Sequence, residues 1–137
     1  MASKQATGTF KLAGWEENTI EEFDGGAKLT RAQIKQDFSG DLEGHGTWES
    51  VMCYRADGKA MFTGLERVVG KIGDRSGSFV LRTEGVYDGT EAKTEWSVVP
   101  DSGTEALEGL KGKGSSVAPH GPNGEFTLDY ELQEPSY

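Results

Sequence analysis

Apolar side chains recur along this chain with a period of two, not with the 3.6-residue period of a helix. The clearest case is the segment 125–132, in which alternate positions are apolar and the positions between them are polar. Its apolar members are Phe126, Leu128, Tyr130 and Leu132. Weaker alternation runs through 6–15, 29–38 and 46–54. This pattern is typical of β-strands that bury one face, so the chain is predicted to be rich in such strands.

Turn signals separate the alternating segments at a fairly even spacing. Asp-Gly pairs begin at Asp24, Asp57 and Asp88, and an Asn-Gly pair begins at Asn123. Both pairs favour the positive φ angles of tight hairpin turns. Eight strands are predicted, at about 6–15, 29–38, 46–54, 59–69, 75–87, 92–100, 112–118 and 125–132. Short strands with regular turns indicate an all-β fold, and we expect a closed antiparallel barrel of about eight strands.

Two segments have a helical pattern. Residues 18–23 are acidic and stop at Asp24-Gly25-Gly26. Residues 102–110 begin with Ser102, and Glu105 follows three positions later, which is the spacing of a capping box. Leu107 and Leu110 are then spaced for one helical face, so this segment is expected to seal a barrel end.

Length and charge narrow the possible functions. The 137 residues fit one domain, with no linker or repeat to divide residues 1–137. The 23 acidic and 14 basic residues give a net charge of -9, which disfavours binding to nucleic acid and to anionic membranes. Cys53 is the single cysteine, so neither an internal disulfide nor a thiolate metal site is expected. No signal-peptide or membrane-spanning run is visible, so a cytoplasmic location is expected.

The sequence lacks the usual motifs of cofactor and nucleophile sites. The Gly-rich nucleotide fingerprint, the phosphate loop and the nucleophile elbow are each broken at a required position, so no cofactor is predicted. His45 and His120 lie too far apart, without local ligand spacing, to predict a metal site. His120 lies in the loop Pro119-His120-Gly121-Pro122, where a structural role and a catalytic role both stay open.

An eight-stranded barrel is just wide enough to be filled by side chains or to hold one small ligand. If the apolar residues near Glu66 face inward, Glu66 does too, and a carboxyl in an apolar cavity acquires a raised pKa suited to proton transfer. Tyr54 would offer a hydroxyl to the same cavity. The candidate catalytic residues are therefore Glu66, Tyr54 and His120. The alternative is that Glu66 faces out and pairs with Lys or Arg.

Aromatic and apolar side chains are expected to line such a cavity, although a solidly packed core would have the same pattern. The candidate ligand-binding residues are Trp48, Met52, Phe62, Phe79, Thr83 and Trp96.

Motifs in a specific order extend along nearly the whole chain. They include 25–31 (GGAKLTR), 38–44 (FSGDLEG), 52–58 (MCYRADG), 64–68 (GLERV), 75–81 (RSGSFVL), 96–100 (WSVVP) and 128–130 (LDY). In this the chain resembles the bacterial family called domain of unknown function 3224, which is similar to the allene oxide cyclase barrel superfamily. The family often carries a His in the strand after Phe-Val-Leu, where this chain has Thr83.

The resemblance implies an eight-stranded barrel assembled as a dimer or trimer. In better-known relatives the barrel interior steers cyclisation or coupling of a small molecule. The expected function is therefore binding of a small hydrophobic molecule, with cyclase or isomerase chemistry in the cavity. A non-catalytic carrier and a structural, oligomerising barrel are the alternatives, because fold-level analogy is weak evidence for activity.

Overall fold

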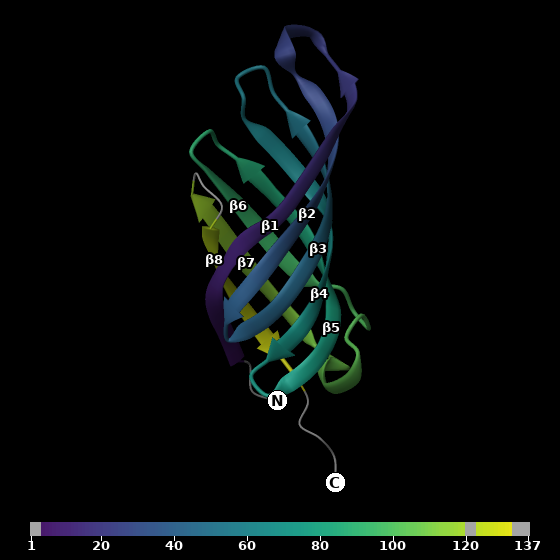
Figure 1. Ribbon diagram of the computed structural model, residues 1–137, viewed down its shortest axis with the longest axis vertical. Coiled ribbons are helices and arrows are strands. Elements are labelled where there is room, and N and C mark those ends of the chain that lie inside the picture. The colour runs from purple at the N-terminus through teal and green to yellow at the C-terminus, as the bar shows by residue number, and fades with distance from the viewer. Residues whose placement is uncertain (1–3, 120–122, 133–137) are drawn as a thin grey trace.

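The chain forms one closed antiparallel β-barrel in a computed structural model that describes residues 4–119 and 123–132 (Figure 1). The strands are β1 (Lys4–Glu22), β2 (Lys28–Gly40), β3 (Leu42–Tyr54), β4 (Ala60–Ile72), β5 (Arg75–Tyr87), β6 (Glu91–Val98), β7 (Lys111–Pro119) and β8 (Asn123–Glu131). Each strand pairs with its neighbours in sequence, and β1 pairs with β8 to close the cylinder. The expected all-β, eight-stranded barrel is confirmed.

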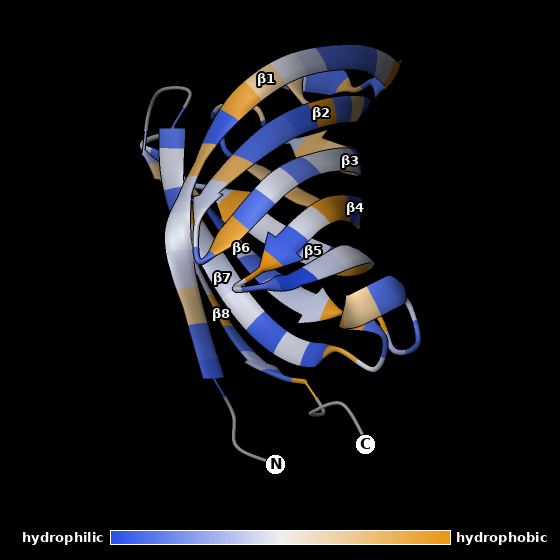
Figure 2. Cartoon of the chain, turned by 60° about the horizontal axis from the view of Figure 1, so that its bottom comes forward, coloured by the Kyte–Doolittle hydropathy of each residue, from blue (hydrophilic) through white to orange (hydrophobic). Residues whose placement is uncertain are grey.

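Alternation along each strand decides which side chains enter the barrel. In β8, Phe126 and Leu128 are buried, while Glu125 and Asp129 on either side of them are exposed. Because of this alternation, hydrophilic and hydrophobic residues follow one another along the strands (Figure 2). The interior is therefore built from every second residue, as the period of two predicts.

The two ends of the barrel differ. We call the end with the β1–β2, β3–β4 and β5–β6 connections the open end; it is uppermost in Figure 1. The opposite, closed end carries the β6–β7 connection, which contains the 3₁₀-helix η2 (Glu105–Leu107). Leu107 and Leu110 of this connection are fully buried against the barrel core. The expected sealing segment is present.

The predicted capping box is wrong in detail. The N-cap of η2 is Thr104, and it makes no side-chain cap bond. Ser102 instead accepts a hydrogen bond from the Val80 backbone N–H, and the Thr104 N–H donates to the Ser78 carbonyl. These bonds tie the connection to β5. They provide a tertiary alternative to the local cap that the spacing suggested.

The predicted helix at 18–23 is also wrong, because residues up to Glu22 continue β1. A 3₁₀ turn, η1 (Asp24–Gly26), then leads into β2. Pairing with β2 shifts register between Leu12 and Gly14 and again between Thr19 and Glu21. Extra residues of this kind form β-bulges, which change the face on which later side chains lie.

The interior is filled unevenly along the barrel axis. In the closed half, the Trp96 and Phe126 rings are stacked with their centroids 5.5 Å apart. The Phe38 ring is perpendicular to both, with centroid distances of 6.0 Å to Trp96 and 5.7 Å to Phe126. Toward the open end a second, smaller cluster contains Ala32, Ile34, Trp48, Met52 and Phe62. Among the described residues no helix is long and apolar enough to cross a membrane.

Candidate functional site

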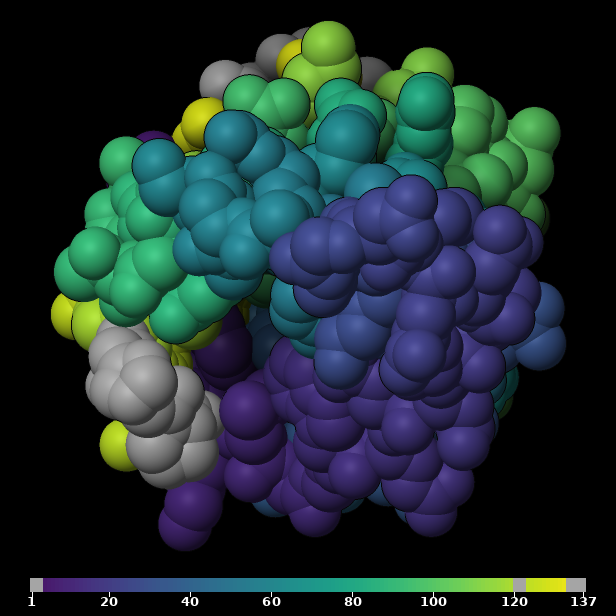
Figure 3. All heavy atoms as spheres, turned by 90° about the horizontal axis from the view of Figure 1, so that it is seen from above, coloured from purple at the N-terminus to yellow at the C-terminus, as the bar shows by residue number. Residues whose placement is uncertain are grey.

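A cavity of about 310 Å³ enters the barrel from the open end; we call it the pocket. Seen from this end, the surface is hollowed between β1 and the β5–β6 hairpin (Figure 3). The lining is mainly aromatic and aliphatic: Phe10, Leu12, Trp15, Gln36, Trp48, Met52, Tyr54, Ala60, Phe62, Tyr87, Ala92, Thr94, Ser116, Ala118 and Pro119. The volume lies at the lower end of the roughly 300–1,000 Å³ typical of small-molecule sites.

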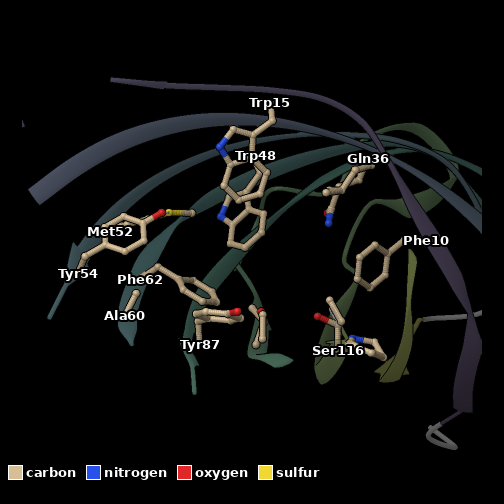
Figure 4. A pocket seen from close by; sticks show the side chains of 15 residues that line it. Phe10, Trp15, Gln36, Trp48, Met52, Tyr54, Ala60, Phe62, Tyr87 and Ser116 are labelled. Carbon is tan, nitrogen blue, oxygen red and sulfur yellow. Dashed lines mark hydrogen bonds between the residues drawn. The ribbon is translucent and has the colours of Figure 1, made fainter. Parts of the chain in front are cut away.

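Polar groups are few on the pocket wall. Gln36 projects between Trp48 and Phe10, and Ser116 lies across from it (Figure 4). The indole N–H of Trp48 is already used, because it donates to the Thr83 hydroxyl at 2.8 Å. A small set of polar groups in an apolar cavity is the usual composition of a site that orients one ligand.

Glu17 organises the rim of the pocket. Its Oε2 accepts hydrogen bonds from the hydroxyls of Thr30 and Tyr54, each at 2.7 Å, and its Oε1 accepts from the Trp15 indole N–H at 3.0 Å. Burial alone would raise the pKa of the Glu17 carboxyl. The hydrogen bonds from these side chains, with the nearby Lys28 charge, outweigh burial and lower the pKa below its ordinary value.

The hydroxyl of Tyr54 is correspondingly hard to ionise. Burial raises its pKa, and the hydrogen bond to Glu17 and the Glu17 charge raise it further. The Lys28 ammonium lies over the Tyr54 ring at 5.1 Å from its centroid. Tyr54 is therefore held as a neutral hydrogen-bond donor at the rim.

Replacing Glu17 by Gln is expected to bring the pKa of Tyr54 down toward its ordinary value of 10.0 without reaching it, because burial of the ring remains. Carbon NMR of the tyrosine rings during a pH titration measures this, with Tyr54→Phe identifying the resonance. Glu16→Gln, on the exposed side of β1, is the matched control. An unchanged Tyr54 titration in Glu17→Gln would contradict the assigned hydrogen bond.

Glu66 lies inside the barrel and is 1% exposed. Burial raises the pKa of its carboxyl to about 8. It does not border the pocket, however, because Gln36 stands between the carboxyl and the cavity: one end of the Gln36 amide lies 2.7 Å from Oε2 and 3.2 Å from Oε1 of Glu66. Glu66 is therefore placed behind the pocket wall and not on it.

The other predicted site residues divide between the two halves of the barrel. Trp48, Met52, Phe62 and Tyr54 border the pocket. Phe79, Thr83 and Trp96 do not, because they lie deeper, where the lumen is packed. Period-two patterning predicts which side of a strand a residue occupies, but not how far along the barrel axis the lumen stays empty. His120 lies outside the described residues.

Most of the lining residues were not predicted, and the polar or rim residues among them are the most informative. Gln36 lies between Ile34 and Phe38 on the inward face of β2, so the alternation contained the signal. Trp15 and Glu17 carried no such signal. The bulge between Leu12 and Gly14 brings them inward, opposite Ile34 and Ala32 of β2. In the described part of the chain no group of three His, Cys, Asp or Glu side chains is placed to hold a metal ion.

Comparison with known proteins gives a family and a fold. The family model described as "Protein of unknown function (DUF3224)" matches residues 6–130. A crystal structure from Shewanella oneidensis, described as a protein with unknown function from the same family, is similar with 27% identity and a TM-score of 0.78. The similarity covers 97% of this chain and 100% of that one. No curated protein matches the sequence.

Proposed function

Because the chain belongs to the DUF3224 family, for which no activity is described, we propose a function from the pocket itself: the barrel binds a small, mainly apolar molecule at its open end. The observation that carries this proposal is the contrast between the two halves of the lumen. The closed half is packed with stacked rings, whereas the open half leaves about 310 Å³ between aromatic walls. A barrel that needed only a core would be filled at both ends.

Burial of apolar surface would supply most of the binding free energy, at roughly 25 cal/mol per Å² removed from water. The described residues of the lining include no Lys or Arg side chain that would compensate a buried anion. The proposed ligand is therefore neutral over most of its surface.

Filling the pocket tests the proposal. Ala60→Trp on β4 is expected to weaken binding of the neutral fluorescent probe phenylnaphthylamine at least about tenfold, because the added indole occupies the cavity. Met61→Trp is the matched control, since the next residue is 62% exposed on the outer face. Ala92→Trp fills the cavity from β6 and repeats the test if Ala60→Trp does not fold. Equal probe binding by wild type and both pocket variants would refute the proposal.

Cyclase or isomerase chemistry is the second candidate, and Tyr54 is the feature that favours it. Its side chain belongs to the pocket lining, and its hydroxyl is paired with the Glu17 carboxylate, as a positioned acid would be. The same pairing raises the pKa of Tyr54, and Glu66 lies behind Gln36. Direct proton transfer is thus less well supported than binding, and a carrier is the better-supported form of the proposal.

Two expectations stay predictions: membership of the allene oxide cyclase barrel superfamily, and assembly into a dimer or trimer. Met61 and Leu65 are exposed on the outer face of β4, where a second copy would have apolar surface to cover. Native mass spectrometry of freshly purified protein would report the subunit number and any retained ligand together.

A further inference from the structure

Gln36 belongs to two environments at once. One end of its amide contacts the buried carboxyl of Glu66, and the side chain also forms part of the pocket wall between Trp48 and Phe10 (Figure 4). Room for the Glu66 carboxyl comes from Gly46, where a Cβ would overlap Oε2 of Glu66 and lie 2.9 Å from the Phe38 ring. The amide therefore connects a sealed carboxyl to the ligand cavity.

Among the described residues, no cationic side chain pairs with the buried carboxyl. Strands β2, β3 and β5, which pack around it, place apolar or uncharged side chains opposite it, including Trp48 and Leu81 in register. The titratable side chains that face the interior among the described residues are Glu17 and Tyr54 at the rim, Tyr87 on the pocket wall and Tyr130 toward the closed end. None contributes to the raised pKa of Glu66, whose cause is burial. Isolated burial of this kind favours the neutral acid.

The protonation state of Glu66 determines how the amide of Gln36 is oriented. A neutral carboxyl can accept as well as donate, but its buried O–H is costly to leave without an acceptor. The Gln36 carbonyl oxygen supplies that acceptor when it faces Glu66, and the NH₂ group then points to the pocket. An ionised carboxylate only accepts, so it draws the NH₂ group and leaves the carbonyl oxygen facing the pocket. The wall thus offers a donor in one state and an acceptor in the other.

We infer that Gln36 recognises the buried end of the ligand, and that the pocket selects apolar molecules that carry a neutral carbonyl, such as ketones or esters. This inference rests on the proposed binding function. With Glu66 neutral, the Gln36 NH₂ group donates to the ligand carbonyl. Carboxylates are disfavoured, because none of the described lining residues carries a positive charge that would compensate their burial. Alcohols fit both states, since a hydroxyl both donates and accepts.

The test is displacement of bound phenylnaphthylamine by methyl hexyl ketone, octanol, octane and octanoate. At about pH 6.5, Gln36→Leu is expected to lower ketone affinity about three- to tenfold, which is the net value of one hydrogen bond, and to leave octane affinity unchanged. From about pH 6.5 to about pH 9.5, wild type is expected to lose ketone affinity by a similar factor, while octanol affinity stays constant. Glu66→Gln removes this pH dependence. Octanoate is expected to bind at least about tenfold more weakly than octanol.

The possible outcomes distinguish a failure of the carbonyl inference from a failure of the proposed binding function. If octane displaces the probe but Gln36→Leu and pH leave ketone binding unchanged, the carbonyl inference is overturned and the binding function stands. Octanoate binding as tightly as the ketone would overturn it as well. If no compound displaces the probe, the pocket function fails with it. Should Gln36→Leu not fold, comparison of wild type with Glu66→Gln across pH decides the inference alone.

Discussion

Glu66→Gln is expected to stabilise the protein at about pH 9 and to change its stability little at about pH 5. The pKa of Glu66 is raised from 4.5 to about 8 in the folded chain, so between these values the folded state holds a proton that the unfolded state has lost. Stability therefore falls as the pH rises through this window. Gln keeps the shape and a hydrogen bond to Gln36 without the ionisation.

The expected gain at about pH 9 is roughly 3–5 kcal/mol, since the whole cost of ionising a buried carboxyl is removed. At about pH 5 the two proteins are expected to differ by about 1 kcal/mol or less. Urea unfolding at both pH values measures this. Glu17 and Asp88, whose pKa values are lowered, lose their contributions below about pH 4.5 and do not act in this window.

Glu84→Gln is the matched control, because this side chain is exposed on the outer face of β5. It is expected to leave the pH dependence of unfolding intact. Parallel stability curves for wild type and Glu66→Gln from about pH 5 to about pH 9 would show that Glu66 is not the titrating group.

Leu107→Ala is expected to reduce the free energy of unfolding by about 2–5 kcal/mol. Leu107 is 0% exposed and packs with Leu110 against the core of the closed half, so its removal leaves a cavity beneath a short 3₁₀-helix. That helix is too short to close the gap by shifting. Equilibrium urea unfolding gives the number.

Glu108→Ala, one residue further along the same connection, is exposed and is expected to change stability by less than about 0.5 kcal/mol. Phenylnaphthylamine binding is expected to survive in folded Leu107→Ala, because the pocket opens at the other end. A loss below about 1 kcal/mol would mean that Leu107 does not seal the barrel.

Strand positions followed from local chemistry, and the sequence therefore predicted them well. The alternation at Phe126 and Leu128 and the Asp-Gly turns are short-range signals, and all eight strands form where those signals lie. The acidic segment 18–23 misled because its helical pattern was short, whereas pairing with β2 provides backbone partners for β1 from Gly8 to Glu22. Tertiary pairing decided what local preference left open.

The site was predictable only in part. Trp48, Met52, Tyr54 and Phe62 lie on the inward faces that alternation assigns, and they reach the pocket. The depth at which the packed interior gives way to the cavity depends on how the rings of Phe38, Trp96 and Phe126 pack. A linear sequence pattern does not contain this information. The position of Glu17 depends on a bulge, whose extra residue is defined only by the register with the neighbouring strand.

Unequal strand lengths give the barrel a sloping rim. β1 has 19 residues and β2 to β5 have 13 each, whereas β6, β7 and β8 have 8, 9 and 9. On the side of the long strands, the pocket is bordered by the large rings of Trp15 and Tyr54. On the side of the short strands β6 and β7, it is bordered by the small side chains of Ala92 and Ala118. For the proposed ligand, the widest approach to the pocket is therefore from the side of β6 and β7, below the level of the β1–β2 hairpin.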